Sequence, residues 1–470
     1  MILTLPKDMI FSKILFLIFL GITVALFVYV ILRAYKIGFT HDESLTFTIL
    51  IGKSNWLLTS NNHWLNTILS YLSFKLFGSS ELALRLPNVF SFLVYSYYCY
   101  KLVVEKSTCI FSTIPPVLFL LLNPFVVDFF GLARGYGLAM AFFSGSLFYF
   151  LKFHEGPDNN KALAKGFLFS VLTIYSNYSF IIPIITLHLG HIIQTYSKKQ
   201  KRLITKKQLL LFGIEVFALF PALGNILLLK KRNELYFGGT NNIIEDTLFS
   251  IFEHTFLVEL INYQNWIILL LILAVLSFGL IIKKQGSLRF LTIVLSAGFL
   301  LPIILHFTLG MNYPLGRAAL YWIVIFGVYF HKFLDYLFET KRKILSYLFT
   351  SNIAFISLFV AFSFSSTINL TYTQQWKYDA DTRSMLEVLN KDVKSGEKYR
   401  LGINWLFEPT INYYIQAKNY DFLEPVTREG VDNKEYDYYY IFDNENINKT
   451  CIKEINTFSV SNTKLIKNCH

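Results

Sequence analysis

The sequence predicts an all-α polytopic membrane protein with about 11 transmembrane helices and a small carboxyl-terminal α/β domain. Of its 470 residues, 54% are hydrophobic and 17% aromatic, whereas only 16% are charged. Soluble globular proteins have about a quarter charged residues, so this composition is typical of a chain in contact with lipid. Long apolar runs recur along most of the chain, and the composition turns polar after about residue 371.

Eleven apolar runs are long enough to cross a hydrocarbon core, which takes about 20 helical residues. The first, 11–32, is too long for a signal-peptide core and lacks a small-residue cleavage site, so we interpret it as a retained helix. Together these runs define a transmembrane domain over residues 1–367. The other ten runs are 86–104, 110–127, 135–153, 163–176, 180–196, 209–229, 266–282, 288–307, 318–333 and 344–364.

The distribution of Lys and Arg sets the orientation of these spans. The segments between spans fall into two alternating sets, of which one carries 18 Lys and Arg residues and the other, although longer, only ten. The positive-inside rule therefore predicts a plasma (inner) membrane protein with a cytoplasmic amino terminus and an extracytoplasmic first loop, 33–85, and tail, 368–470. The net charge of +12, with its strongest cluster at 198–202, reflects this topology. Nucleic-acid binding is not predicted, because no basic groove motif accompanies the charge.

The tail, 368–470, alternates helical and strand-like patterns as a small α/β domain does. It contains neither a glycine-rich phosphate loop nor a metal-spaced Cys/His set, so acceptor binding or a structural role is expected. Cys451 and Cys469 both lie in it, and a disulfide between them is possible if the tail is extracytoplasmic. The predicted elements are helices over 379–395 and 408–417 and strands over 399–407 and 436–442.

The most unusual part of the first outer loop is Gly38–Ser44, which follows the first span directly. His41, Asp42 and Glu43 place three titratable groups at the membrane surface, where partial desolvation raises the basicity of a carboxylate and suits it to general-base catalysis. An ordinary polar helix exit is the alternative. Adjacent side chains do not point into one small site unless the backbone turns. We therefore expect Asp42 to act as the general base and Glu43 to have a positioning role.

A second feature of this loop is the segment 63–72, in which apolar residues recur at helical spacing after two asparagines. This pattern predicts a helix in the membrane interface. His63 lies at its start. One interpretation is a hydrogen-bonded helix cap; another is that His63 joins His41 and Asp42 around a phosphate or a divalent metal, the only cofactor that the sequence suggests.

Three arginines lie at the predicted outer ends of spans: Arg85, Arg134 and Arg317. Interfacial snorkelling is the simpler interpretation of each. Three guanidinium groups on the same side as paired carboxylates are, however, the complement of a phosphate-bearing substrate, because guanidinium matches phosphate oxygens in bidentate fashion. The pattern favours a phosphorylated lipid donor that approaches from the outer leaflet.

Four segments in about the first 200 residues resemble the GT-C glycosyltransferases of the protein O-mannosyltransferase and aminoarabinose-transferase type. The segments are specific in combination and in this order: His41–Glu43, His63–Thr67, Phe77–Pro87 and Ala133–Tyr136. The chain departs from the common family pattern at His63 and Trp64, where many relatives have His-Pro-Pro. It also lacks the Trp-Trp-Asp signature of oligosaccharyltransferases, which argues against transfer of whole oligosaccharides to asparagine.

The resemblance implies a many-helix membrane fold and a donor sugar linked to polyprenyl phosphate. It matches Asp42 to the family base and Arg134 to the arginine that holds the donor phosphate, and Tyr136, of the same Arg-x-Tyr motif, is a further candidate for substrate binding. Arg317 resembles a later family arginine. The implied activity is transfer of one hexose or pentose, with inversion, to a lipid, polysaccharide or protein acceptor on the extracytoplasmic face.

The alternative function is a transporter or flippase of lipid-linked sugars in cell-envelope biogenesis. It predicts ionisable residues buried mid-span and inverted repeats, whereas the predicted spans carry few such residues, such as Glu215, and their halves do not mirror each other. A structural scaffold is a third option, but it leaves the grouped acidic residues and arginines unexplained. The sequence therefore favours a glycosyltransferase.

Overall fold

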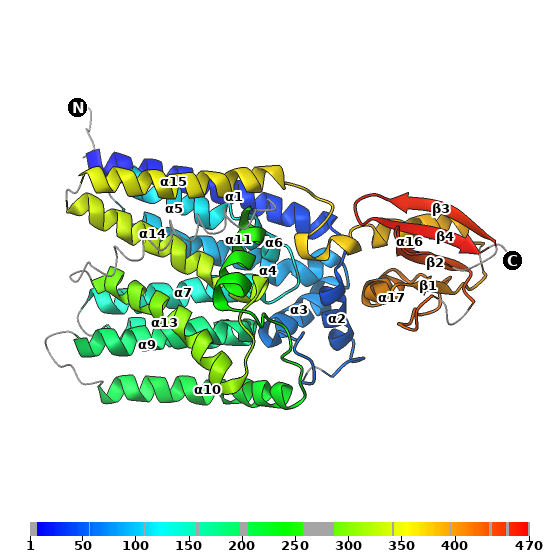
Figure 1. Ribbon diagram of the computed structural model, residues 1–470, viewed down its shortest axis with the longest axis horizontal. Coiled ribbons are helices and arrows are strands. Elements are labelled where there is room, and N and C mark those ends of the chain that lie inside the picture. Colours follow the sequence, from blue (N-terminus) through cyan, green and yellow to red (C-terminus); the bar gives the residue numbers. More distant parts are fainter. Residues whose placement is uncertain are drawn as a thin grey trace.

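The computed structural model describes residues 7–468 except 56, 108, 157–158, 198–204, 257–285, 341–342, 395, 432–434 and 448–450. Long helices run side by side through most of it, and a sheet lies at one end of this bundle (Figure 1). The bundle consists of α1 (Lys7–Lys36), α4 (Glu81–Cys99), η1 (Tyr100–Val104), α5 (Ile110–Leu121), α6 (Pro124–Phe130), α7 (Tyr136–Glu155), α8 (Asn160–Ser176), η2 (Tyr178–Phe180), α9 (Ile181–Ser197), α10 (Lys206–Lys231), η3 (Ile243–Phe249), α11 (Ser250–Phe256), α13 (Gly286–Leu309), η4 (Gly316–Ala319), α14 (Tyr321–Glu339) and α15 (Lys343–Ser366).

Ten of the eleven predicted spans coincide with helices, while the run 266–282 and the basic cluster 198–202 fall outside the described residues. Seven of the described helices are long and apolar enough to cross a membrane by themselves, and the bent pair α5 and α6 would make eight. The remaining two of the ten are α4 and α8, and α8 has only 17 residues. The chain is therefore a multi-pass membrane protein.

Helices α5 and α6 are bent by 53° relative to each other, the geometry of a broken span or of a re-entrant loop. Asn123 starts the second helix, because its Oδ1 accepts hydrogen bonds from the backbone N–H groups of Phe125 and Val126 at 3.1 and 3.2 Å. Pro124 occupies the first turn of α6, where its missing N–H costs no hydrogen bond. The break brings Asp128 of α6 into an ion pair with a residue near the end of α1, Arg33.

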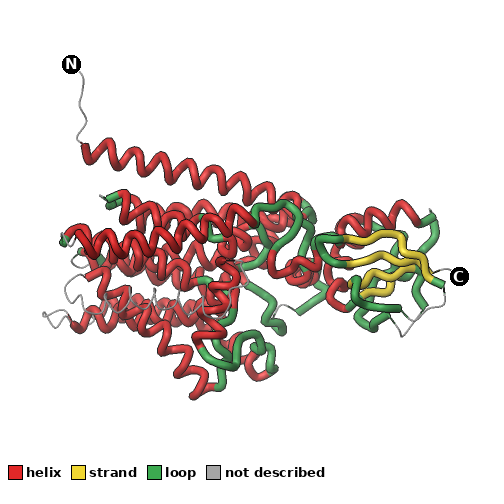
Figure 2. The backbone as a smooth tube through the Cα atoms, turned by 45° about the horizontal axis from the view of Figure 1, so that its top comes forward, coloured by secondary structure: helices red, strands yellow, loops and turns green. Residues whose placement is uncertain are grey.

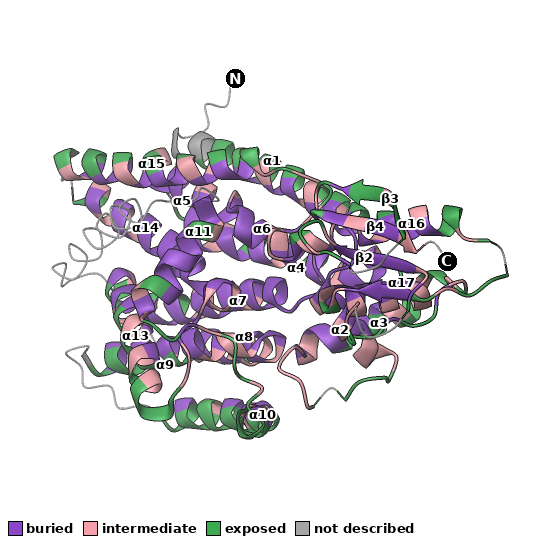
Figure 3. Ribbon diagram, turned by 45° about the vertical axis from the view of Figure 1, so that its right-hand side comes forward, coloured by how far each residue is buried: buried purple, intermediate pink, exposed green. Residues whose placement is uncertain are grey.

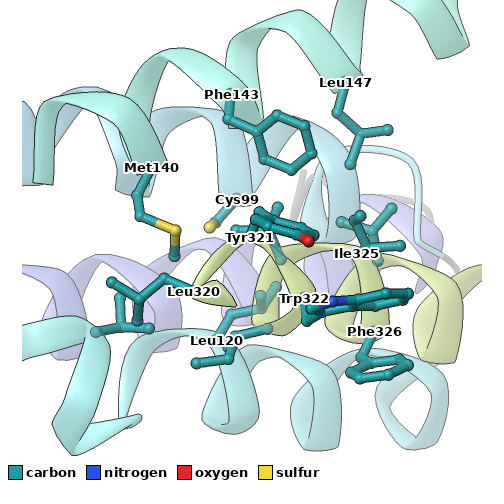
Figure 4. Packing of buried hydrophobic residues seen from close by; sticks show 14 of the residues in the cluster. Cys99, Leu120, Met140, Phe143, Leu147, Leu320, Tyr321, Trp322, Ile325 and Phe326 are labelled. Carbon is teal, nitrogen blue, oxygen red and sulfur yellow. The ribbon is translucent and has the colours of Figure 1, made fainter. Parts of the chain in front are cut away.

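The centre of the bundle is α14, of whose 19 residues 14 are buried. Its Trp322 packs against Phe299 and Phe326, with ring centroids 4.5 and 5.3 Å apart, among the aliphatic side chains of Figure 4. At Gly327 a Cβ atom would lie 2.5 Å from the side chain of Leu120, so the close approach of α5 requires glycine. Exposed apolar residues gather instead on α1, α10 and α15 (Figure 3), as expected for helices that face lipid.

The carboxyl-terminal region contains a sheet, drawn in yellow in Figure 2. Its four described strands have the order β1-β2-β4-β3, with β1 and β2 parallel and the other neighbours antiparallel. Its elements are α16 (Thr382–Asp392), β1 (Leu401–Ile403), η6 (Trp405–Phe407), α17 (Glu408–Lys418), β2 (Tyr438–Phe442), β3 (Ile452–Phe458) and β4 (Thr463–Asn468). The strand predicted over 399–407 ends early, because Asn404 caps the turn η6. Sequence analysis missed β3 and β4, and the bridge to Cys469 falls outside the described residues.

Short elements join the bundle to this sheet domain: α2 (His41–Leu50), α3 (Trp64–Phe77) and η5 (Gln374–Asp379). Arg33 fastens the chain that leads into η5, because it donates to the carbonyls of Asn369 and Tyr372 at 2.9 and 3.0 Å. Its partner Asp128 accepts from the backbone N–H of Gln374 at 3.0 Å. Because α17 also packs on α2, the acidic segment is held between the bundle and the sheet domain.

Candidate functional site

The acidic segment forms the first turn of α2, where a capping box fixes its side chains. Thr40 Oγ1 accepts from the backbone N–H of Glu43 at 3.5 Å, and Glu43 Oε2 accepts from the backbone N–H of Thr40 at 3.0 Å. Consecutive residues of a helix point about 100° apart. Asp42 therefore points away from the direction in which the cap holds Glu43.

Glu43 is completely buried in an ion pair with Arg85, which is also fully buried. The two side chains meet in bidentate fashion, with Arg85 Nε and Nη2 donating to Glu43 Oε1 and Oε2 at 2.7 and 2.6 Å. The backbone N–H of Ala133 donates to Oε1 at 2.6 Å. Arg85 also donates to the carbonyls of Ala34, Ile37 and Gly38. This saturated arrangement argues for a structural role of the pair, and against catalysis by Glu43 or phosphate binding by Arg85.

Asp42 lies instead between two arginines. Its Oδ2 atom is 3.4 Å from Nη2 of Arg134 and 3.4 Å from Nη2 of Arg317. Neither arginine forms a bidentate pair with it, and the carboxylate retains 13% exposure. The three residues come from α2, from the loop before α7 and from η4, so the predicted convergence of acid and arginines is present in the structure.

The pKa of Asp42 reflects these neighbours. Burial alone raises it, but the two guanidinium groups, His41 and a hydrogen bond from the Trp376 side chain together lower the pKa below its usual 3.8. Desolvation acts in the expected direction, but the expectation of a net rise in basicity is wrong, because it left out the two cations. Asp42 is ionised at neutral pH and becomes a stronger base when the arginines are neutralised.

Arg134 is held by backbone as well as by charge. Its Nη1 donates to the carbonyls of Asn61 and Asp42 at 2.9 and 3.3 Å, so the segment between α1 and α4 wraps around the buried guanidinium. The next residue is Gly135, where a Cβ atom would lie 1.9 Å from the carbonyl oxygen of Ser176. Only glycine permits this contact between the start of α7 and the end of α8.

Arg317 lies between two aromatic rings, with its Cζ atom 4.6 Å from the centroid of Phe237 and 5.0 Å from that of Trp376. Its Nη1 donates to Oε1 of Gln375 at 3.0 Å. Burial acts to lower the pKa of Arg317, but its interactions with Tyr136 and Asp42 outweigh burial and raise it. Cation–π contacts on both sides hold the guanidinium while leaving N–H groups available. The contacts with Phe237, Trp376 and Gln375 therefore position Arg317.

His63 is buried beside the same arginines. Burial, and next the charges of Arg134 and Arg317, keep its pKa well below the usual value, so the imidazole is neutral. Its ring meets that of Tyr136 edge-on at 5.2 Å, and its Nε2 has no hydrogen-bond partner in the described part of the chain. His63 precedes α3, yet its side chain makes no capping hydrogen bond, so the interpretation as a hydrogen-bonded cap is wrong.

His41 faces the sheet domain rather than the arginines. Its Nδ1 contacts the carbonyl oxygen of Leu406 at 2.7 Å, and its backbone N–H donates to Oδ2 of Asp379 at 2.7 Å. His41, Asp42 and His63 thus point to different partners. Among the described residues, no group of three or more His, Cys, Asp or Glu side chains is arranged to hold a metal ion.

Sequence analysis missed the contribution of η5, which follows the last span. Gln375 and Trp376 hold Arg317, and Asp379 accepts from His41 and, at 3.0 Å, from the hydroxyl of Thr410. Asp379 is fully buried, which keeps its pKa well above the usual value. The available signal was a cluster of aromatic and acidic residues at the point where the composition turns polar.

The bundle and the sheet domain are the architecture of a polytopic membrane protein, and its likeness to solved structures identifies the GT-C fold. The structure of ArnT from Cupriavidus metallidurans bound to undecaprenyl phosphate is similar at a TM-score of 0.55 and 9% identity, over 96% of this chain and 97% of that chain. The apo structure of ArnT from the same organism is similar at a TM-score of 0.54 and 10% identity, over 85% of this chain and 84% of that chain. No family model matches the sequence, and no curated protein does. At this identity the likeness establishes the fold that the sequence resemblance implied.

Proposed function

We propose that the chain is a membrane glycosyltransferase that moves one sugar from a polyprenyl phosphate to an acceptor on the extracytoplasmic face. The observation that carries the proposal is Asp42 between Arg134 and Arg317, where the bundle meets the sheet domain. ArnT was crystallised with undecaprenyl phosphate, and the shared fold supports a lipid donor of that class for this chain.

In the proposed mechanism the donor phosphate binds Arg134 and Arg317. The anion takes up their positive charge, so Asp42 loses the interactions that lower its pKa and becomes a better base at the moment when the donor is in place. The free Nε2 of His63 hydrogen-bonds an oxygen of the same donor. Donor binding thus prepares the base.

The transfer itself forms one bond and breaks one bond at the anomeric carbon. Asp42 takes the proton of an acceptor hydroxyl, whose oxygen attacks the anomeric carbon from the face opposite the phosphate. The bond between that carbon and the phosphate oxygen breaks, and its electron pair stays on the phosphate, where the two arginines stabilise it. The products are the glycosylated acceptor, with inverted configuration, and free polyprenyl phosphate.

The proposal is tested with the full chain purified into lipid nanodiscs. Undecaprenyl phosphates that carry labelled glucose, mannose, N-acetylglucosamine or aminoarabinose are offered with cell-envelope lipid, polysaccharide and protein fractions, and products are identified by mass spectrometry. Parallel reactions with EDTA or added Mg²⁺ and Mn²⁺ determine whether a metal takes part. Transfer that is lost in Asp42→Asn supports the proposal, and equal transfer by this folded variant would overturn it.

A transporter of lipid-linked sugars remains the second candidate because of one observation. Glu215 of α10 is buried, and its carboxylate contacts Nε2 of His188 in α9 at 2.8 Å, so the spans do contain a buried pair of titratable groups. Transport alone does not explain a carboxylate placed between two arginines next to the sheet domain. The two functions separate in the nanodisc assay, because a transporter releases no polyprenyl phosphate from its donor.

A further inference from the structure

The turn η6, directly after β1, exposes a large aromatic side chain next to the acidic segment. Trp405 is 51% exposed, although most of the aromatic side chains of the sheet domain are buried. Its ring meets that of His41 edge-on, with centroids 6.2 Å apart and an interplanar angle of 88°. His41 directly precedes Asp42, the base of the proposed function, so the indole contacts the sequence neighbour of that base.

The exposure of Trp405 is not that of a loose loop, because the turn is fixed on both sides. Asn404 Oδ1 accepts from the backbone N–H of Leu406 at 3.1 Å, and its Nδ2 donates to Glu445 at 2.6 Å. The Leu406 carbonyl meets His41, and Phe407 is completely buried. The fold therefore holds an apolar surface in a set position in water, which favours binding because little ordering remains to be done.

Charged groups border this surface. The Arg428 guanidinium lies over the indole, with its Cζ atom 5.7 Å from the ring centroid, and its Nε donates to Oε2 of Glu408 at 3.1 Å. The side chains of Arg428 and Glu408 are 46% and 25% exposed. Asn412 donates to the other Glu408 oxygen at 2.8 Å, which fixes the carboxylate. An aromatic face thus stands beside hydrogen-bond donors and an acceptor of fixed direction.

We propose that Trp405, Arg428 and Glu408 bind a carbohydrate acceptor. A sugar ring has an apolar C–H face and a rim of hydroxyl groups, so an aromatic ring flanked by planar charged groups matches both. An acyl chain would use only the ring. This inference rests on the proposed function and adds the chemical class of the acceptor.

The proposed acceptor site, formed by Trp405, Arg428 and Glu408, and the two donor arginines belong to different parts of the fold. Arg134 and Arg317 precede helices of the bundle, α7 and α14, whereas Trp405 belongs to the sheet domain. Donor and acceptor sites on separate domains fit a reaction in which a lipid-borne sugar meets an acceptor at the junction. The assignment gives the sheet domain a binding role in addition to its contacts with α2.

The test compares wild type with Trp405→Ala and Trp405→Phe in full-length chain in nanodiscs. Transfer from labelled undecaprenyl-phosphate sugars is measured with maltotriose, chitotriose, mannotriose and the envelope polysaccharide fraction as acceptors, with donor and acceptor varied separately. Ile452→Ala is the matched control, because Ile452 is also exposed, at 43%, in the same domain. Trp405→Ala is expected to raise the acceptor KM about tenfold or more, with the donor KM unchanged and Trp405→Phe close to wild type.

Three outcomes would overturn the assignment while leaving the proposed function intact. The first is an unchanged acceptor KM in Trp405→Ala. The second is a parallel rise of the donor KM, which identifies Trp405 as an anchor in the membrane interface. The third is transfer by wild type to lipid or protein only. If wild type uses none of the donors, the proposed function itself fails, and this inference fails with it.

Discussion

Asp42 and Glu43 are neighbours in the sequence, but their surroundings are opposite in kind. Glu43 is fully buried against one arginine and receives short hydrogen bonds on both oxygens. Asp42 keeps partial exposure and shares two arginines at 3.4 Å, while the Nε atoms of Arg134 and Arg317 have no hydrogen-bond partner in the described structure. We call the saturated pair of Glu43 and Arg85 the closed cluster. The group of Asp42, Arg134 and Arg317, which keeps unused hydrogen-bonding atoms, is the open cluster.

The difference separates structure from function within a single helical turn. A saturated buried ion pair binds nothing further, and breaking it costs stability because one charge remains unpaired. An unsaturated group of charges keeps capacity for an anionic ligand, and the strain of like charges held together is relieved when the ligand arrives. The open cluster is therefore the expected site of chemistry, and the closed one is its support.

Replacing the open carboxylate should give the largest effect on activity. Asp42→Asn keeps the shape of the side chain but removes the base, so transfer by folded, inserted protein should fall by about 10²- to 10⁴-fold. Rates normalised to folded, inserted protein measure this. A variant that retains more than a tenth of wild-type transfer would show that another group accepts the proton.

Substitutions of the two arginines in the open cluster should give the next largest loss of activity. Arg134→Lys and Arg317→Lys preserve charge but lose the planar guanidinium, so each should lower kcat/KM for the donor by about 10- to 10³-fold. Initial rates at varied donor concentration test this. Arg383→Lys is the control, since Arg383 is partly exposed and pairs with Glu81 at 3.5 Å outside the cluster. Equal losses in all three variants would contradict a specific role.

Substitutions in the closed cluster should lower the stability of the protein. Glu43→Gln leaves the buried Arg85 without its counter-charge, so the free energy of unfolding should fall by about 3 to 5 kcal/mol. Glu43→Gln combined with Arg85→Met should recover part of the loss. Glu105→Gln breaks the exposed pair with Lys101 and should cost less than about 1 kcal/mol. A folded Glu43→Gln protein of normal stability but no activity would return Glu43 to the catalytic residues.

A smaller effect is expected where the sheet domain holds α2. Asp379→Ala removes the acceptor of the His41 N–H and should lower the free energy of unfolding by about 1 to 3 kcal/mol. Asp379→Asn should cost less, because burial raises the pKa of Asp379 and favours its neutral form, which an amide resembles. Thermal unfolding in nanodiscs checks the order of the two variants, and a reversed order would contradict it.

The pH dependence of kcat/KM and of kcat compares Asp42 in the free protein with Asp42 in the donor complex. In the free protein the pKa of Asp42 lies below 3.8, so kcat/KM for the donor should not fall through this group between pH 7 and 5. In the donor complex the phosphate occupies the arginines and the pKa rises, so the acid limb of kcat should lie at higher pH. Coincident acid limbs would mean that donor binding leaves Asp42 unchanged.

Much of this organisation could be predicted from the sequence because it depends on local pattern. Apolar runs located ten spans in the described chain, and the change of composition after residue 371 located the sheet domain. The acidic segment and the arginines at span ends pointed to the cluster of Asp42, Arg134 and Arg317. These signals need no knowledge of how distant segments pack.

What the sequence could not provide depends on contacts across the fold. The sign of the Asp42 pKa shift requires both arginines to be placed, and Arg85 separates from them only because its partner is Glu43. One local signal was overlooked: Thr40 followed by Glu43 is a capping box, which assigns Glu43 to the helix start. The contribution of η5 comes from the far end of the transmembrane region, so no spacing rule predicts it.

The most direct test of the account is the binding of undecaprenyl phosphate to wild type and Asp42→Asn, measured by native mass spectrometry or calorimetry in nanodiscs. If the arginines hold the phosphate and Asp42 competes for them, the variant binds the lipid at least as tightly as wild type and yet fails to transfer sugar. Weaker binding by Asp42→Asn, parallel to its loss of transfer, would contradict the separation of the base from the phosphate site.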